Sequence, residues 1–316
     1  MTINASLLAT LIDFASYRGI PSKILYALVE EKNIDWSAPE SSVSKASYLR
    51  VLAYISQQDK APQLGLNFGF FLNLSALGMV HQISLQTKSI EQALLVLQSY
   101  LEQQFPLLAL KINPVKESIH IELHSTIQDQ KLKAVIVESS FVFIARELQL
   151  MLPHNSLVLF MPNIPLASKL SSLNNRIQEG TFYSFQIDST AIKQGINPRN
   201  LQHIEVLLPQ YLKMIYQNKH SHSFVGITKN IMLHLCAPEL PNMQAVCDLL
   251  ALSTRSFQRK LHKENSSFRK ISLEIKQELS TFLEADKQLK IQDIAYILGY
   301  SEASAYIHAR NNWQKA

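Results

Sequence analysis

Apolar residues recur at three- and four-residue spacing through four segments in the first third of the chain, and this period predicts amphipathic helices. The segments are Ala5 to Tyr17, Pro21 to Glu30, Val43 to Gln57 and Ile90 to Gln104. Pro21 suits the first position of a helix, and Ser89 is placed to cap the last of the four. The chain is therefore expected to open with helices.

Alternation of apolar and polar residues predicts four strands farther along. They are Leu107 to Ile112 and Ser118 to His124, on either side of a turn at Asn113-Pro114, then Leu157 to Met161 and Phe182 to Ile187. A helical period over Gln130 to Met151 separates the two pairs. This order indicates an α+β domain over residues 1–200, with a small antiparallel sheet packed on helices.

A helix and a polar joint are expected over residues 201–223. The apolar stripe of this helix consists of Leu201, Ile204, Leu208, Leu212 and Ile215. The stripe can pack on its own domain or pair with a second copy of the chain, so a homodimer is one expected partner. The stretch Gln217 to Ser223 is polar, and its His220 and His222 are expected to be solvated rather than bound to a metal.

The segment Met243 to Leu261, MQAVCDLLALSTRSFQRKL, has the pattern of two short helices joined by a turn at Ala251-Leu252-Ser253. Ser253 is suited to cap the second helix, in which Phe257 and Leu261 share one face. The opposite face carries Arg255, Ser256, Gln258, Arg259 and Lys260, which can donate to guanine, pair with adenine or neutralise phosphate. This pattern predicts a DNA-binding helix-turn-helix; the alternative is a helical hairpin with a solvated basic face.

A second copy of the pattern spans Ile291 to Ser301. Gly299 stands at the position of Ala251, and Ser301 at that of the capping Ser253. Glycine enters the left-handed conformation without steric cost, whereas alanine there is disfavoured by roughly 1 kcal/mol. The first turn is therefore expected to be tighter or mildly strained.

Between the copies, Ser267 to about Glu284 contains neither Pro nor Gly and is expected to form one continuous helix. Its apolar residues at helical spacing are Phe268, Ile271, Ile275, Leu279 and Phe282. Such a helix spans on the order of 27 Å, enough to hold two reading helices about one DNA turn apart. Residues 224–316 are thus expected to form an all-α domain with two helix-turn-helix units joined by a long helix.

This arrangement resembles the C-terminal domain of the AraC/XylS family of bacterial transcription regulators over about Val225 to Trp313. The matching motifs are Ala-Val-x-x-x-Leu before the first turn, Ser-x-Arg-Ser-Phe-Gln-Arg-Lys-Leu after it, Ser-Phe-Arg-Lys-Ile opening the long helix, and Asp-Ile-Ala-x-x-Leu-Gly-Tyr-Ser-Glu-x-Ser-Ala in the second unit. The resemblance implies binding to double-stranded promoter DNA, and to RNA polymerase if the protein activates transcription. In the second unit it implies DNA contacts from Ala303, Ser304, His308 and Asn311.

The last residues depart from the family pattern. Arg310 stands where Phe is usual, so its charge either reaches solvent or costs several kcal/mol if buried without a partner. His308 stands where Arg is common, and neutral histidine is a weaker contact to phosphate or bases. The sequence stops at Ala316, before the family's last short helix. We therefore expect the second unit to position the domain more than it reads DNA.

Residues 20–190 resemble the N-terminal effector domain of one branch of the same family, which is named for arabinose binding although most members' ligands are unassigned. The matches are Leu64-Gly65-Leu66-Asn67-Phe68-Gly69, Leu77-Gly78-Met79, Ser89-Ile90-Glu91-Gln92-Ala93-Leu94, Glu138, and Phe182 to Asp188. The resemblance implies a small-molecule effector. It does not imply the jelly roll of the arabinose regulator itself, because that fold needs about eight strands and only four are predicted here.

Composition fits a two-domain cytoplasmic protein. The chain has 316 residues, of which 47% are hydrophobic, and a formal net charge of +5. Within residues 251–270 the single acid Glu264 faces a concentration of cations, namely Arg255, Arg259, Lys260, Lys263, Arg269 and Lys270. Cys236 and Cys247 are expected to be packed thiols. No secretion signal and no long apolar run is present, so no membrane partner is expected.

Catalytic motifs are absent from the sequence. It lacks Gly-x-Ser-x-Gly, Gly-x-x-x-x-Gly-Lys, His-Glu-x-x-His and Cys-x-x-Cys, and neither cysteine lies in the Pro-Cys-His-Arg sequence of a DNA alkyl-transfer enzyme. His120 and His124 lie about 13 Å apart along one predicted strand, too far to share a metal easily. Glu138 can pair with Arg146 or face an effector, and a structural role is favoured over chemistry. No enzymatic activity, cofactor or metal is expected.

Together these patterns predict a one-component regulator. Its C-terminal domain would grip promoter DNA through Arg255, Gln258 and Arg259, while its N-terminal domain senses a small molecule or sets the oligomeric state. The alternative is a protein-interaction regulator whose second helix-turn-helix no longer supports DNA binding and which pairs with intact relatives.

Overall fold

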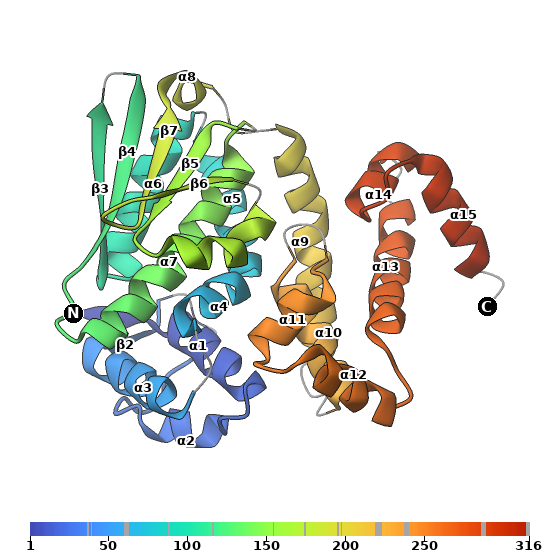
Figure 1. Ribbon diagram of the computed structural model, residues 1–316, viewed down its shortest axis with the longest axis horizontal. Helices are drawn as coiled ribbons and strands as arrows, with labels where there is room; N and C mark the ends of the chain where they lie inside the picture. Colours follow the sequence, from blue (N-terminus) through green and yellow to red (C-terminus); the bar gives the residue numbers. More distant parts are fainter. Residues whose placement is uncertain are drawn as a thin grey trace. The chain divides into compact units, whose positions relative to one another are not determined.

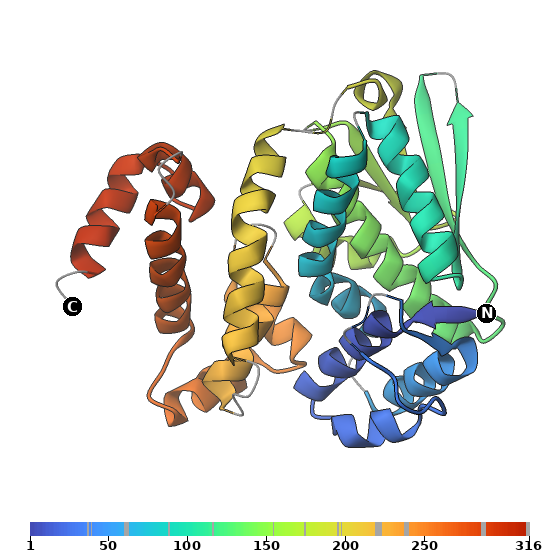
Figure 2. The ribbon, with the colours of Figure 1, turned by 180° about the vertical axis from the view of Figure 1, so that it is seen from behind.

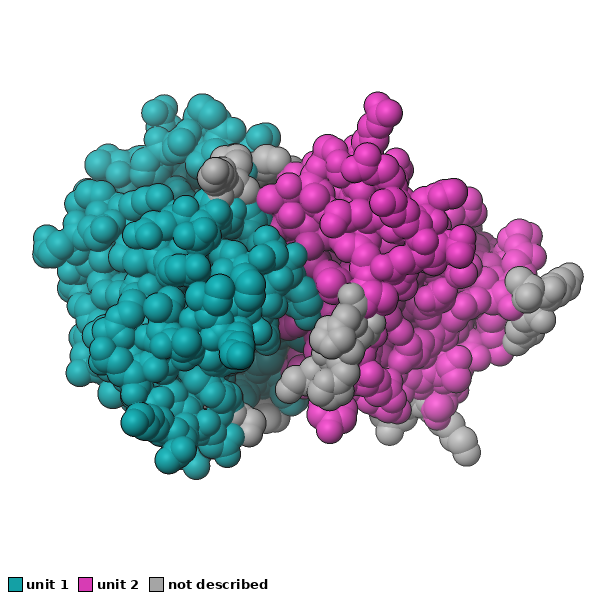
Figure 3. All heavy atoms as spheres, turned by 90° about the horizontal axis from the view of Figure 1, so that it is seen from below, with its two compact units in different colours: residues 1–201 teal, residues 202–316 magenta. Residues whose placement is uncertain are grey.

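The computed structural model describes residues 1–316 except for 37, 39, 60–62, 88, 116, 154, 174, 195, 197, 219–222, 237–239, 286–288 and 314–316. His220 and His222 therefore lie outside the described residues. The chain divides into two compact units, Met1–Leu201 and Gln202–Ala316, which have different colours in Figure 3. Helix α9, Pro198–Asn218, begins just before this division and continues beyond it.

The first unit opens with two short strands that each lead into a helix. Strand β1 (Thr2–Asn4) precedes α1 (Ala5–Tyr17), and β2 (Ser42–Ser44) precedes α3 (Lys45–Gln58). The two strands pair antiparallel, and the last residue of each caps its helix: Asn4 Oδ1 accepts from Ser6 N at 2.8 Å and Ser44 Oγ from Ser47 N at 3.1 Å. The prediction that Val43 belongs to a helix is wrong, because this fully buried residue pairs with Ile3.

Helix α2 spans Ser22–Ala27 directly after Pro21, so it is shorter than the predicted segment. Helix α6, Ile90–Gln104, has the predicted bounds, and Ser89 Oγ caps it by accepting from Gln92 N at 3.3 Å. Two helices between α3 and α6 were not expected, namely α4 (Leu64–Phe71) and α5 (Asn73–Gln86). Helix α4 lacks a polar face, so it gives no amphipathic period and is instead suited to the interior.

Two glycines let α4 approach α7, the central helix of this unit, which spans Gln130–Met151 as predicted. A Cβ placed on Gly65 would lie 2.7 Å from Glu138 Cβ, and one on Gly69 would lie 2.6 Å from Val142 Cβ. No larger residue fits at either position without moving a helix. The glycines of the sequence motif are therefore contact points between helices.

A five-stranded sheet has the order β3-β4-β7-β5-β6. Its strands are β3 (Leu108–Val115), β4 (Ser118–Ser125), β5 (Leu157–Met161), β6 (Arg176–Glu179) and β7 (Ser184–Asp188). The expectation of a purely antiparallel sheet is corrected at β5 and β6, which pair parallel. The predicted turn at Asn113-Pro114 is also wrong, because β3 continues through it; β3 is an edge strand, where a proline without an N–H is tolerated.

Helices α6 and α7 lie on one face of this sheet (Figures 1 and 2). Alternate strand residues such as Leu110, Ile121 and Phe185 are buried toward the helices. Phe141 of α7 stacks on Phe185 with ring centroids 5.0 Å apart. The 3-10 helix η1 (Ile164–Leu173) and the short α8 (Ser189–Ile192) complete the unit.

The second unit contains helices and no strand among its described residues. After α9 come α10 (Phe224–His234), α11 (Met243–Leu249), α12 (Thr254–Lys263), α13 (Phe268–Ala285), α14 (Ile291–Ile297) and α15 (Ala303–Trp313). Helix α13 has nearly the predicted bounds, but Leu283 is buried in place of Phe282. Along this helix the α11–α12 pair lies toward one end and the α14–α15 pair toward the other (Figure 1).

The apolar stripe predicted for α9 is only partly correct. Its buried positions include Ile204, Leu207, Tyr211 and Met214, whereas Leu212 of the predicted stripe is 51% exposed. Two overlapping apolar stripes run along α9 and share Ile204, so periodicity alone could not choose between them.

Over the described ranges, no single helix is both long and apolar enough to cross a lipid bilayer. The bent pair of residues 64–71 and 73–84 passes that test of length and composition only when its two helices are taken together.

Candidate nucleic-acid interface

The sequence predicted that the turn between α11 and α12 would be either tighter or mildly strained. The structure shows the strained form. Ala251 has a φ of +53°, which is left-handed and costs an alanine about 1 kcal/mol. Two backbone hydrogen bonds hold the turn, from Ala251 N to Asp248 O at 3.2 Å and from Leu252 N to Cys247 O at 3.0 Å. These bonds close the end of α11 and direct the chain into α12.

Helix α12 is fixed by a cap and by two buried side chains. Ser253 Oγ accepts from Ser256 N at 3.2 Å, as predicted. Phe257 and Leu261 are both fully buried. The Phe257 ring lies 5.5 Å from that of Phe224 and 6.4 Å from that of Phe268, so α12 is anchored to both α10 and the start of α13.

The opposite face of α12 is open. Arg255, Gln258, Arg259 and Lys260 are exposed, and Ser256 is partly exposed. Gln258 Nε2 lies 3.8 Å from Met243 Sδ, and Lys260 Nζ lies 5.1 Å from the centroid of the Phe224 ring. Both contacts are weak and leave the polar ends accessible. All predicted contact residues of α12 except Ser256 are thus free to meet a ligand.

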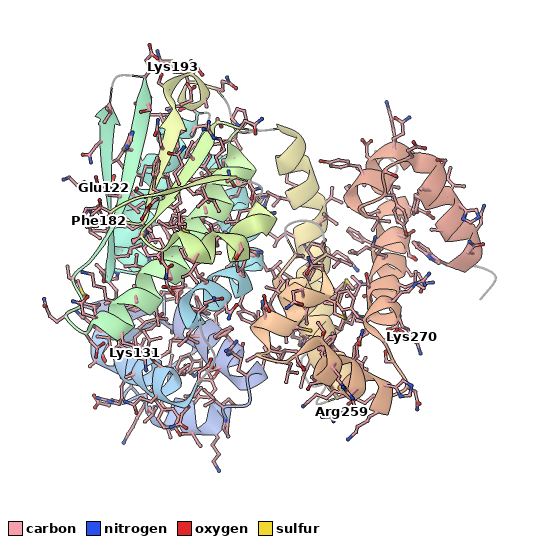
Figure 4. The ribbon with its side chains drawn as sticks, in the orientation of Figure 1. Glu122, Lys131, Phe182, Lys193, Arg259 and Lys270 are labelled. Carbon is pink, nitrogen blue, oxygen red and sulfur yellow. The ribbon has the colours of Figure 1, made fainter. Side chains whose placement is uncertain are left out.

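The basic charge of this surface is not neutralised within the unit. Lys263, Arg269 and Lys270 are exposed as well, and no ion pair in the described part of the chain engages Arg255, Arg259 or these three cations. Figure 4 shows Arg259 on α12 and Lys270 at the beginning of α13. We name this surface, formed by residues 255, 259, 260, 263, 269 and 270, the basic surface.

Glu264, the only acid within residues 251–270, does not pair with these cations but binds the start of α10. Its two carboxylate oxygens accept from Phe224 N and Val225 N, each at 2.8 Å, at the first turn of α10. A carboxylate at the N-terminus of a helix satisfies free amide groups and is favoured by the helix dipole. The sequence could not reveal this role, because Glu264 and its partners lie about forty residues apart.

The turn of the α14–α15 pair repeats the first turn. Gly299 has a φ of +75°, Gly299 N donates to Tyr296 O at 3.0 Å, and Tyr300 N donates to Ala295 O at 2.9 Å. These residues correspond to Ala251, Asp248, Leu252 and Cys247 of the first turn. The predicted equivalence of Gly299 and Ala251 therefore holds at the backbone.

Beyond the turn the correspondence shifts by one residue. Helix α15 begins at Ala303, and Tyr306 N donates to Glu302 O as Phe257 N donates to Ser253 O. The prediction that Ser301 caps the second helix is therefore wrong, since Glu302 occupies that place. The second turn is one residue longer than the first.

The predicted contact residues of α15 include no arginine and no lysine. Ser304, His308 and Asn311 are exposed and Ala303 is half-buried. Ser304 Oγ donates to Glu302 at 3.1 Å. This surface has no counterpart of the arginines on α12.

Arg310 follows neither of the two outcomes expected for it. Its Nε lies 2.7 Å from Glu284 Oε1 of α13, and the two side chains are 38% and 31% exposed. Tyr306 Oη donates to the same oxygen and also lies 2.7 Å from Ser280 Oγ. The pKa of Tyr306 is raised to about 12, chiefly by burial and then by the hydrogen bond to Glu284.

The first unit holds the other candidates. Glu138 accepts from Tyr183 Oη at 3.4 Å, burial raises its pKa, and Gly65 packs against it. Arg146 donates to Gln149 Oε1 at 2.7 Å. His124 pairs with Glu122 at 3.0 Å, and within the described residues no three His, Cys, Asp or Glu side chains could together hold a metal.

Sequence reasoning missed one acid of α7. Glu147 is fully buried, neither carboxylate oxygen has a hydrogen-bond partner among the described residues, and burial raises its pKa well above the ordinary value. Cys236 and Cys247 are buried and form no disulfide, and the pKa of Cys247 is raised to about 11 by burial and by Asp248.

Comparisons with known proteins add little to this description. No protein-family model matches the chain, and no curated protein matches it. Among solved structures, the chain is similar to the crystal structure of transcriptional regulator CdpR from Pseudomonas aeruginosa, with 15% sequence identity over 84% of this chain and 88% of that one. The TM-score is 0.37, and a likeness at this level carries no argument about function.

Proposed function

We propose that this chain is a sequence-specific DNA-binding transcription regulator of the AraC/XylS type, in which α11–α12 and α14–α15 are two helix-turn-helix units. One observation carries the proposal: α12 buries Phe257 and Leu261 while exposing Arg255, Gln258 and Arg259 on its other side. A short helix anchored in this way can enter the major groove without rearranging its unit.

The side chains divide by chemistry into two roles. Arg255 and Arg259 suit bidentate contacts to guanine, and Gln258 suits adenine. Lys263, Arg269 and Lys270, on the rest of the basic surface, suit phosphate contacts that position the protein but do not read sequence. Arg269 and Lys270 stand in the first turn of α13, where the helix dipole disfavours cations, so a structural role explains them poorly.

The α14–α15 pair has a supporting role in this proposal. Its exposed Ser304, His308 and Asn311 can donate to or accept from DNA, but none of them is an arginine or a lysine. Helix α13 has 18 residues, so the two pairs can reach successive grooves about one DNA turn apart. We infer that the second pair adds register and length of contact more than affinity.

The first unit is proposed to sense a small molecule or to set the oligomeric state. Half-buried Glu138 beside Tyr183, and fully buried Glu147, are two acids of α7, and burial of a carboxyl group is costly unless that group has a role. A ligand acts on DNA binding only if it prefers one arrangement of the protein over another.

Selection of genomic fragments by the purified full-length protein tests the proposal, followed by gel-shift titration at rising salt. A recovered consensus, together with an affinity that falls steeply with salt, is the expected outcome because the basic surface would displace counterions from phosphates. Binding with no sequence preference, or no salt-sensitive complex, would count against it.

A protein-interaction regulator is the second candidate. It is favoured by the apolar residues that the α14–α15 pair exposes, namely Ile291 at 48%, Tyr296 at 44% and Ile307 at 38%. Failure of the purified protein to select DNA, combined with self-association that is lost when these residues become polar, would establish this candidate instead.

A further inference from the structure

The long helix α13 carries a polar stripe beside its buried apolar one. Lys276, Ser280 and Glu284 recur every four residues, so they lie one above another along the helix. All three side chains contact the α14–α15 pair. Lys276 Nζ, for example, lies 4.6 Å from the centroid of the Tyr300 ring in the turn of that pair. The second pair is thus held to α13 by polar contacts along this stripe.

Tyr306 and Arg310 of α15 meet the other two members of the stripe. Tyr306 is 1% exposed and Ser280 is 4% exposed, so their hydrogen bond lies in the interior. Glu284 Oε1 takes both the Tyr306 hydroxyl and Arg310 Nε. A single carboxylate oxygen therefore receives two donors that are one helical turn apart on α15.

The apolar anchor of α15 is small. In this helix, all of whose residues are described, Tyr306 is the one buried residue, whereas α12 buries both Phe257 and Leu261. A single buried ring holds a helix in place without fixing its rotation about its own axis. A second contact one turn away, from Arg310 to Glu284, fixes that rotation.

We propose that Glu284 and Arg310 are positioning residues that set the rotation of α15 on α13, and with it the direction in which Ser304, His308 and Asn311 face. Arg310 is then a structural cation and not a DNA contact. The consequence for DNA rests on the proposed function, but the positioning itself does not.

Trp313 gives a direct readout of this contact, because its ring lies 6.3 Å from that of Tyr306. The chain has two tryptophans, so a Trp36→Phe background leaves Trp313 as the sole one. In that background we compare Glu284→Gln, Arg310→Met and Arg310→Lys. Glu278→Gln is the matched control, because it makes the same change on the same helix but its partner is Lys229 of α10.

Glu284→Gln and Arg310→Met are expected to shift the Trp313 emission and to speed amide exchange of residues 303–313 by about three- to tenfold. Arg310→Lys should restore part of the protection, and Glu278→Gln should leave α15 unchanged. Equal exchange of α15 in the parent and in both variants would overturn the proposal. So would loss of protection in α12 as well as α15, because it would indicate general unfolding.

DNA binding supplies a separate readout. We take a selected DNA site with two conserved sequence boxes, the first contacted by α12 and the second by α15. The Glu284→Gln variant should no longer protect the second box from cleavage, while its affinity for the first box should stay within about twofold. If the parent protein selects no DNA, the proposed function fails, and amide exchange still decides the positioning role. If the Arg310→Met variant loses both boxes equally, Arg310 is a DNA contact and the positioning role is wrong.

Discussion

The α11–α12 and α14–α15 pairs share a turn but differ in what holds them and in what they expose. Their turns make the same two backbone hydrogen bonds around a left-handed residue, Ala251 or Gly299. Helix α12 is anchored by apolar side chains, and its two arginines form no ion pair within the described part of the chain. Helix α15 is anchored partly by charge, because its Arg310 forms an ion pair with Glu284 of α13.

The comparison indicates that two helix pairs with the same turn can differ in role. The difference depends on whether their cations face solvent or pair with acids of the same chain. A cation that pairs with its own chain cannot also neutralise phosphate. Under the proposed function, the ion pair that stabilises α15 also removes one cation from its contact with DNA.

Replacing Phe257 by Ala should have the largest effect, because it removes the aromatic anchor between α10, α12 and α13. We expect a loss of about 3 to 5 kcal/mol in the free energy of unfolding of the second unit. Denaturant unfolding followed by Trp313 fluorescence measures it. Tyr306→Phe, which removes one hydroxyl, should cost only about 1 kcal/mol; equal losses would mean that the two helices are anchored alike.

Arg255→Ala and Arg259→Ala should each weaken binding to the selected site by about 1 to 3 kcal/mol, and relax the preference at one base pair if the arginine reads a base. A uniform loss over all sequences would assign the residue to phosphate. His308→Ala and Asn311→Ala should each cost less than about 1 kcal/mol. Arg176→Ala, an exposed arginine of the first unit, is the matched control. Losses from His308→Ala as large as those from Arg259→Ala would remove the proposed difference between the pairs.

Alkaline pH should loosen the contact between α15 and α13 through Tyr306. Burial and the bond to Glu284 raise the pKa of Tyr306 to about 12 in the folded protein, against an ordinary value near 10. The stabilisation is therefore complete below about pH 10 and is lost as the pH rises through 12, by no more than about 3 kcal/mol. Trp313 emission against pH measures the change, and Tyr306→Phe should abolish this part of the pH dependence. A profile unchanged by that substitution would refute the assignment.

The two turns should respond to exchanged residues with opposite signs. Ala251→Gly should stabilise the second unit by somewhat under 1 kcal/mol, because it relieves a left-handed alanine at the cost of a freer unfolded chain. Gly299→Ala should destabilise it by about 1 kcal/mol, although a Cβ there would meet nothing nearer than Lys276 Nζ at 3.9 Å. Thermal melts of the two variants check this, and shifts of the same sign would contradict it.

Strong local patterns predicted much of the fold. The bounds of α1, α6 and α7 follow from their periodicity and caps, and the turn before α12 follows from the capping Ser253. These features depend on residues within a few positions of one another. The exposed face of α12 was predictable for the same reason.

Features that depend on distant residues were not predictable. Helix α4 is apolar on all sides, so only its contact with α7 explains it, and β6 is recognised as a strand only by its pairing with β5. The partner of Arg310 lies 26 residues earlier in the chain, so no local pattern indicates their ion pair. Tertiary contacts decided each case.

The bond from Glu264 to the first turn of α10 has a mechanical consequence. Glu264 directly follows the last residue of α12, and its carboxylate grips Phe224 N and Val225 N, where α10 starts. Any displacement of α12 is therefore transmitted through this carboxylate to the first turn of α10. One short side chain couples the motions of two helices that lie about forty residues apart in the sequence.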